Sequence, residues 1–249
     1  MTHAKLFELL NAFPIRYPTS IDGEPLVIPV PSCPARRIKG RAFFPGGSGH
    51  SEGEVARLPA NPIFTLGDNF GSWGYYTKCV LRGEEPLDNP TWKDLLEIYE
   101  QAGLDPQCCF HSNVYMGFIP GESNSKEKMF VTKEFRCDCE SFLTWQIRTI
   151  TPKAIIALGS KAKDALADIS PEIQIVWGSK SYNDLYLDNS LLLQNSSIPI
   201  GQGNWHGDVI TIMHPALRKG NLGKSRKRLG IDAESIELES LRKFASRNS

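Results

Sequence analysis

Side chains that could take part in catalysis follow three apolar runs of the sequence at the point where each run ends: Asp68 and Asn69 after 63–66, Asn113 at the end of 109–113, and His214 after 209–213. Carboxylate, amide and imidazole groups serve in proton transfer and in hydrogen-bond recognition. If the runs are parallel strands, their ends meet at one edge of a sheet, where open α/β folds bind ligands. We therefore predict one site built from three strand ends.

Short apolar runs alternate with amphipathic segments from residue 62 onward, which is typical of a parallel sheet covered by helices on both faces. Four runs have the length of strands: 63–66, 109–113, 154–158 and 209–213. Periodicity, proline and glycine positions predict four helices: about 90–103, about 143–150, about 161–168 with Ser160 as its cap, and about 232–244. The expected fold class is α/β, in three α/β/α layers.

The chain divides into two parts by composition. Residues 1–60 contain many prolines, which prevent long regular elements, so we expect an irregular extension packed on the core, with a short helix near Phe7–Leu10. Residues 61–249 form the α/β domain. Within it, 172–204 is expected to add one or two strands or loops.

Composition excludes several classes of protein. The 249 residues carry 28 basic and 28 acidic side chains, so the net charge gives no overall electrostatic attraction to nucleic acid or membrane. The segment 214–230, however, has six basic residues and no acidic one. The six cysteines lack paired C-x-x-C spacing, which predicts buried thiols and no metal. No membrane span or signal peptide is expected, and we predict a cytoplasmic protein.

Four segments, in order, resemble motifs of the uracil-DNA glycosylase superfamily: Gly-Asp-Asn-Phe-Gly at 67–71, the asparagine segment 113–121, the helix-strand-glycine stretch within 139–162, and His-Pro-Ala-Leu at 214–217. The resemblance covers about 62–220. It implies a central four-stranded, mainly parallel sheet with strand order 2-1-3-4.

The chain departs from members that carry an iron–sulfur cluster. They have a cysteine pair near the N-terminus and a cysteine four residues after the base-reading asparagine, where this chain has Gly117. Cys139 occupies the position of their last ligand but stands alone. We therefore expect a member without a cluster or any other cofactor.

The resemblance assigns the chemistry of base removal to the strand ends, with the base turned out of the DNA stack into a pocket. Asn69 would hold the attacking water through its amide oxygen, and Asp68 would be a backup base. His214 would donate a hydrogen bond to the departing, negatively charged base.

Recognition of the base would fall to Asn113, whose amide offers a donor beside an acceptor and so matches uracil but not cytosine. One of several nearby aromatic rings would stack on the flipped base, with Phe70 and Tyr76 as the candidates and Trp73 and Tyr75 as neighbours.

A DNA-binding surface is expected beside His214. Leu217 would fill the gap left in the base stack, and the phosphates would be bound by basic side chains: Arg218, Lys219, Arg226, Lys227 and Arg228. The predicted partner is single- or double-stranded DNA, bound by a monomer.

Each of these residues also has a structural interpretation. Asp68 and Asn69 form turns readily, a histidine or an asparagine at a strand end can tie strand to loop, and the aromatic rings and basic side chains can be core and solvated surface.

Three other functions compete with this interpretation. The Gly67-Asp68 pair resembles the opening of serine esterases, but Asn69 cannot replace their serine nucleophile. No phosphate-binding loop of the type Gly-x-x-x-x-Gly-Lys-Ser/Thr occurs. A catalytically inactive relative that binds DNA or a nucleobase remains the alternative to a monofunctional glycosylase acting in base-excision DNA repair or in another setting.

Overall fold

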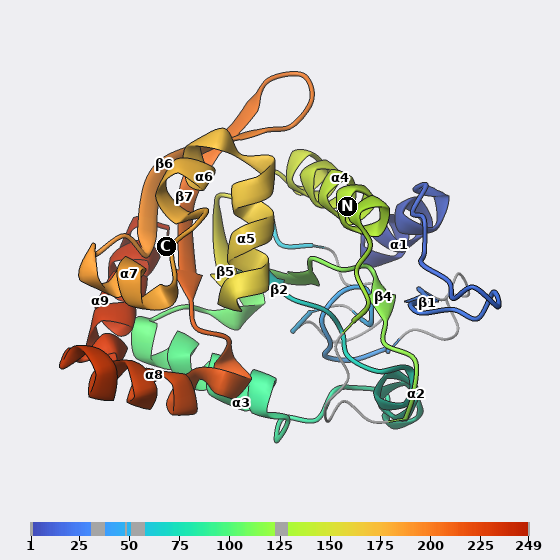
Figure 1. Ribbon diagram of the computed structural model, residues 1–249, viewed down its shortest axis with the longest axis horizontal. Coiled ribbons are helices and arrows are strands. Elements are labelled where there is room, and N and C mark those ends of the chain that lie inside the picture. Colours follow the sequence, from blue (N-terminus) through green and yellow to red (C-terminus); the bar gives the residue numbers. More distant parts are fainter. Residues whose placement is uncertain (1, 31–37, 48, 51–57, 123–128, 249) are drawn as a thin grey trace.

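The computed structural model describes residues 2–30, 38–47, 49–50, 58–122 and 129–248. In this part of the chain the main sheet has five strands in the order β3-β2-β5-β7-β6 (Figure 1). Their bounds are Ile63–Gly67 (β2), Cys109–Asn113 (β3), Ala154–Leu158 (β5), Leu192–Pro199 (β6) and Asn204–Ile212 (β7). The first three and β7 run parallel, whereas β6 pairs antiparallel with β7.

The predicted α/β class and mainly parallel sheet are confirmed, but the strand number and order are not. Among the described residues β6 adds a fifth strand at the edge, so the order along the chain is 2-1-3-5-4. The register of β6 shifts between Leu193 and Ser196, and Asn195 has a φ of 50°. This bulge breaks the two-residue alternation by which a sequence reveals an edge strand.

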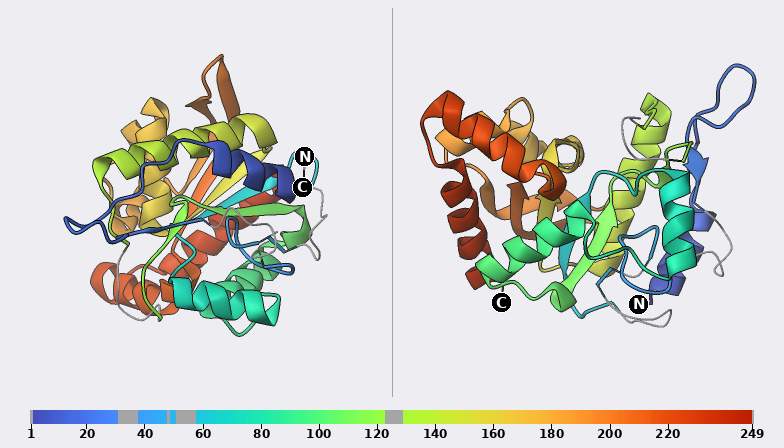
Figure 2. Two further views of the ribbon diagram at one scale, coloured as in Figure 1. Left: turned by 90° about the vertical axis from the view of Figure 1, so that its right-hand side faces the viewer. Right: turned by 90° about the horizontal axis from the view of Figure 1, so that it is seen from below.

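Helices cover both faces of the sheet (Figure 2). One face carries α4 (Lys133–Ile150) and α5 (Gly159–Ile169), and the other carries α3 (Pro90–Ala102) and α9 (Ala233–Arg247). Helix α8 (Pro215–Leu229) begins at the end of β7 and lies against α3 and α9. Strands buried from both sides are apolar along their whole length, which explains the continuous runs in the sequence.

Shorter elements complete the described chain: α2 (Trp73–Arg82), the 3-10 turn Pro106–Cys108, α6 (Pro171–Trp177) and α7 (Tyr182–Leu187). Near the N-terminus, α1 (His3–Ala12) is longer than the expected helix, and β1 (Ile28–Pro29) pairs with β4 (Gly117–Phe118). Leu6 and Phe7 are buried in the core, where the Phe7 ring lies 5.4 Å from that of Phe44. The N-terminal extension therefore contributes side chains to the core.

The start of α5 differs from the prediction. Ser160 does not cap it, because the helix begins at Gly159 and makes no side-chain capping bond. Gly159 has a φ of +82°, and a Cβ added there would lie 2.9 Å from the Cβ of His214. Glycine is needed here for its backbone conformation and for the close approach of the turn that carries His214.

We predict that Gly159→Ala lowers the free energy of unfolding by about 1–3 kcal/mol, because it combines left-handed backbone strain with a steric clash. Gly220→Ala is the matched control: this glycine lies within α8 and a Cβ there meets nothing within 4 Å. The control should gain about 0.5–1 kcal/mol from helix propensity. Urea denaturation measures both, and a Gly159→Ala protein as stable as the wild type would contradict this account.

Candidate active site

A cavity of about 380 Å³ opens at the carboxyl ends of the parallel strands. One wall consists of residues that end or follow these strands: Gly67, Asp68, Asn69, Phe70, Gly71, Asn113, Leu158, His214, Ala216 and Leu217. The second wall is formed by residues of the N-terminal region, of α2, of the α2–α3 connection and of the start of α3, and by Ile119. The residues from these four segments are Phe43, Tyr75, Glu85, Asn89 and Thr91. The three predicted strand ends therefore meet in one place.

Strand register brings these side chains together. Gly67 pairs with Asn113 across β2 and β3, and Leu158 pairs with Ile212 across β5 and β7. A Cβ at Gly67 would lie 2.5 Å from Oδ1 of Asn113, so only glycine lets the amide lie against the neighbouring strand. The Nδ2 of Asn113 donates to the carbonyl of Phe44 at 3.1 Å. The amide is thus held in one orientation at the cavity wall.

Asn69 both forms a turn and lines the cavity, so its structural and its functional interpretation hold together. Its Oδ1 accepts the backbone N–H of Gly71 at 2.8 Å, which closes a local turn, and the residue also lines the cavity. A carbonyl oxygen has two lone pairs, so one acceptor position of Oδ1 is left for a second donor.

The carboxyl of Asp68 lies in an environment that favours its protonated form. Burial raises the pKa of Asp68, and a hydrogen bond from Asn69 together with the charge of Lys161 offsets this only in part. A carboxylate with a raised pKa is better matched to proton transfer near neutral pH than an ordinary one.

His214 sits in the turn between β7 and α8. It is the N-cap residue of α8, but its side chain makes no capping bond. Its Nδ1 is buried, and no partner reaches it among the described residues. Burial lowers the pKa of His214, so the imidazole is neutral at pH 7 and one ring nitrogen carries a proton that it can donate.

The aromatic surface of the cavity differs in part from the prediction. Phe70 lines the cavity, but Tyr76 does not: it is 1% exposed and its ring packs 4.4 Å from that of Phe118. Tyr75 lines the cavity in its place. Phe43 contributes a further ring, and no motif in the sequence indicates it.

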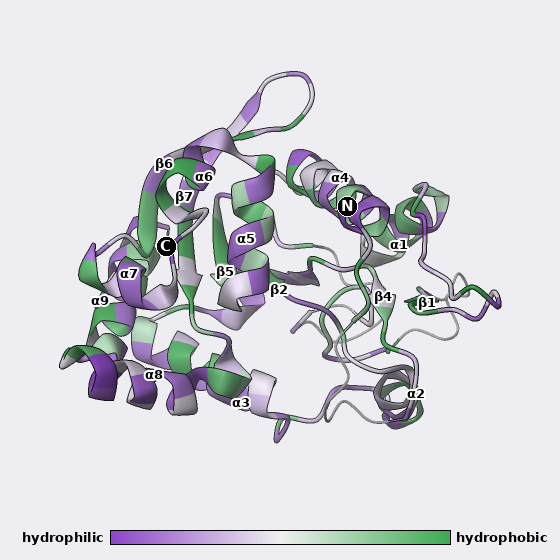
Figure 3. Ribbon diagram, viewed as in Figure 1, coloured by the Kyte–Doolittle hydropathy of each residue, from purple (hydrophilic) through white to green (hydrophobic). Residues whose placement is uncertain are grey.

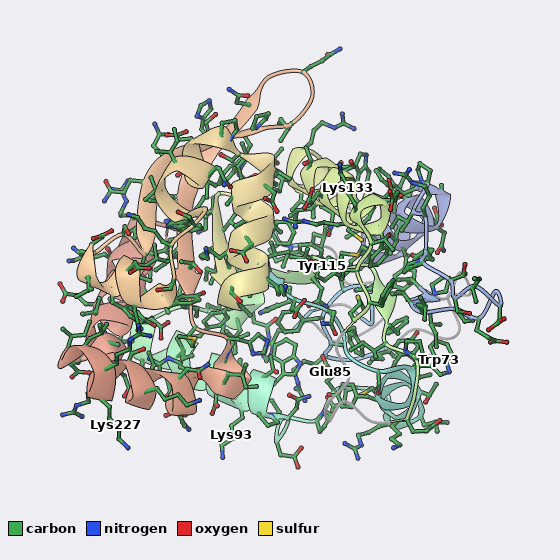
Figure 4. All side chains as sticks on the ribbon, viewed as in Figure 1. Trp73, Glu85, Lys93, Tyr115, Lys133 and Lys227 are labelled. Atoms are coloured by element: carbon green, nitrogen blue, oxygen red, sulfur yellow. The ribbon has the colours of Figure 1, made fainter. Side chains whose placement is uncertain are left out.

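The second cavity wall holds a chain of hydrogen bonds centred on Glu85 (labelled in Figure 4). Its carboxylate accepts the indole N–H of Trp92 at 2.9 Å, the backbone N–H of Phe43 at 3.2 Å and the hydroxyl of Tyr75 at 2.9 Å. Asn89 donates in turn to the Tyr75 hydroxyl. These residues fix the shape and polarity of this wall, and no sequence pattern distinguishes Glu85 from the other acidic residues.

The expected DNA-binding residues fall into separate groups. Leu217 is 61% exposed and lines the cavity. Arg218 contradicts its prediction as a phosphate ligand: it is 5% exposed, and its guanidinium bonds Glu237 at 2.7 Å and Glu234 at 3.0 Å. Lys219 is exposed but pairs with Asp94 at 3.2 Å.

Arg226, Lys227 and Arg228 are exposed in the last turns of α8. At 1.5 Å per residue, Arg226 is roughly 14 Å along the helix from Leu217. Figure 3 shows α8 as largely hydrophilic, and in Figure 4 Lys227 points away from the molecule. Any phosphates that these side chains contact would therefore lie some distance from a base held in the cavity.

The residues that the structure describes contain neither a metal site nor a helix that could span a membrane. Among the described residues no group of three histidine, cysteine or acidic side chains is placed to hold a metal ion. Cys79, Cys109 and Cys139 are buried free thiols, as predicted, but Cys108 and Cys137 are exposed, so the prediction is wrong for these two. Cys33 lies outside the described residues. None of the described helices combines the length and apolar character that crossing a bilayer requires.

Comparison with known proteins identifies the family of this chain. The family model described as Uracil DNA glycosylase superfamily matches residues 78–230, more than half of the chain, including Asn113 and His214. A search of curated proteins gives no match. The resemblance that the motifs indicated is confirmed, and the chain belongs to the uracil DNA glycosylase superfamily.

Proposed function

We propose that the protein is a monofunctional DNA glycosylase that hydrolyses the bond between deoxyribose and a uracil or related base turned out of the DNA stack. The observation that carries this proposal is the convergence of Asn69, Asn113 and His214 on one cavity at the strand ends. Membership of the superfamily supports DNA as the partner.

Base recognition would use the fixed amide of Asn113. One of its N–H groups is bound to the carbonyl of Phe44, and the second N–H and the carbonyl oxygen remain for the edge of a pyrimidine. Phe70 and Phe43, which both line the cavity, offer aromatic surface on which the ring could stack.

Bond cleavage requires a water molecule on the side of the sugar opposite the base. The free acceptor position of Asn69 would orient that water, and Asp68 would take up its proton. The departing base gathers negative charge, which the N–H of neutral His214 and the positive end of the α8 dipole would stabilise more in the transition state than in the ground state.

Leu217 is the candidate for filling the space left in the base stack, because it is apolar, exposed and at the cavity. The phosphates would be bound by Lys219 and by Arg226, Lys227 and Arg228. Arg218 has no part in this proposal, since its charge is already paired inside the protein.

The alternative is an inactive relative that binds DNA or a nucleobase. One observation favours it: the motif has an amide rather than a carboxylate at residue 69, and that amide already accepts a bond from Gly71. Measurement of base release separates the two functions.

We predict that His214→Ala lowers the rate constant of uracil release by about 10²–10³, the usual loss on removing one transition-state donor. His206→Ala is the control, because His206 is exposed on β7, the strand that precedes the turn of His214. Single-turnover assays on uracil-containing oligonucleotides, with alkali to cleave abasic sites, measure both. Equal rates in the two variants would exclude this role for His214.

The rate should depend on pH through Asp68. A general base must be ionised, so the rate should fall as the pH drops through the pKa of Asp68, which burial raises above its ordinary value. Asp68→Asn should lower the rate and remove this acidic limb. The test is a series of single-turnover rates between about pH 4 and pH 8, and a limb of the same shape in the variant would assign it to another group.

Binding to DNA should depend on salt through α8. Replacing Arg226, Lys227 and Arg228 by alanine should reduce the slope of log K against log salt by about 0.9 for each phosphate that is no longer neutralised. Arg148→Ala/Lys153→Ala is the control, because both residues lie near the amino end of β5, away from the cavity. Fluorescence anisotropy measures the slopes. An unchanged slope in the triple variant would remove this cluster from the DNA-binding surface.

A further inference from the structure

The turn that carries His214 is held by a residue from another part of the chain. The turn joins β7, which ends at Ile212, to α8, which begins at Pro215. Among the described residues no hydrogen bond fixes Nδ1 of the ring. The position of the imidazole therefore depends on packing, such as that of Gly159 against the Cβ of His214, and on the backbone on either side of it.

Glu237 in α9 bonds to both sides of this turn. One carboxylate oxygen, Oε1, accepts the backbone N–H of Met213, directly before the histidine. The other, Oε2, accepts the Nε–H of Arg218 at 2.7 Å, one helical turn after it. A single carboxylate thus bridges the last residue before His214 and the first turn of α8.

The bridge lies in the interior, where its geometry is strictly determined. Glu237 is 1% exposed and Arg218 is 5% exposed. Burial, together with the nearby charge of Glu234, raises the pKa of Glu237, and the charge of Arg218 with the two hydrogen bonds offsets this only in part. Removal of one partner of a buried pair leaves an uncompensated charge, so these groups have little freedom to separate.

We propose that Glu237 is a positioning residue for His214, holding the imidazole at the cavity through Met213 and Arg218. Glu237 lies beyond the segment 78–230 that matches the family model, so α9 adds this support from outside the matched region. The catalytic consequence rests on the proposed glycosylase function, whereas the positioning itself is independent of it.

Glu237→Gln tests the proposal with the least change in volume. The two carboxylate oxygens of Glu237 accept from two donors, Met213 and Arg218. A glutamine has only one oxygen, and its NH2 group cannot accept a hydrogen bond. The turn therefore loses one of its two bonds. Glu234→Gln is the matched control: Glu234 lies on the same helix and bonds the same Arg218 at 3.0 Å, but it is 60% exposed and no bond joins it to Met213.

We expect Glu237→Gln to lower the single-turnover rate constant by 10- to 100-fold, because small displacements of a catalytic group have effects of this size. The Kd for uracil-containing DNA should stay within twofold of the wild type. The pKa of His214, followed by NMR and assigned by loss of its signal in His214→Ala, should rise towards its ordinary value as the ring gains solvent. Glu234→Gln should leave all three unchanged.

Two results would overturn the proposal: a folded Glu237→Gln protein with the rate constant and His214 pKa of the wild type, or equal changes in Glu234→Gln. If the wild type releases no base, the proposed function fails, but the NMR comparison still decides whether Glu237 positions His214. Circular dichroism at the assay temperature verifies that each variant is folded. If Glu237→Gln does not fold, Arg218→Met takes its place in the same NMR comparison and must shift the His214 signal.

Discussion

Burial of the parallel strands determines where the functional side chains of this protein lie. No residue of Ile63–Leu66, of β5, or of the last four positions of β7 is more than 2% exposed. A shift of one of these strands by one residue would move every side chain to the opposite face, where it would meet different neighbours in a closely packed core. The register is therefore strongly determined. Because Asp68, Asn69, Asn113 and His214 lie at or just after strand ends, the same register places them around one cavity.

The shape of the cavity depends on close packing at glycines as well as on hydrogen bonds. Gly67 gives room to the amide of Asn113, and Gly159 gives room to the turn of His214. The buried carboxylates of Glu85 and Glu237 each organise one side of the cavity region through backbone and side-chain donors. The polar groups available to a ligand are therefore fixed before any ligand binds, which is what catalysis by oriented dipoles requires.

Sequence periodicity was sufficient to predict the positions of the central strands and of helix α3, because each follows a regular pattern with clear ends. Helix α3, for example, begins at Pro90, with Asn89 as its N-cap, and Gly103 ends it. Strand β6 lies within the segment 172–204, for which one or two strands or loops were expected, but its bounds could not be predicted because a bulge interrupts its alternation. The choice of Tyr76 over Tyr75 could not be settled, because it depends on where α2 begins. Adjacent residues of a helix point about 100° apart, and only the three-dimensional position of α2 decides which ring faces the cavity.

Charge was the least predictable property of the site. Arg218 and Lys219 are neighbours in a basic stretch, yet one is buried on Glu237 and the other is exposed beside Asp94. Their acidic partners come from α9 and α3, elements distant in the sequence. Similarly, Phe43, Glu85 and Glu237 became recognisable only once the fold brought them to the cavity or to the turn of His214.

The central claim is that this cavity breaks the bond between a base and DNA, and the most direct test is to detect the free base. The purified protein would be incubated, in excess over DNA, with single- and double-stranded oligonucleotides that contain uracil, hypoxanthine or a mismatched base. Mass spectrometry would then follow both the base and the strand. The account predicts a free base together with an intact abasic strand. Salt-dependent DNA binding without a free base from any substrate would contradict it and would favour the binding protein instead.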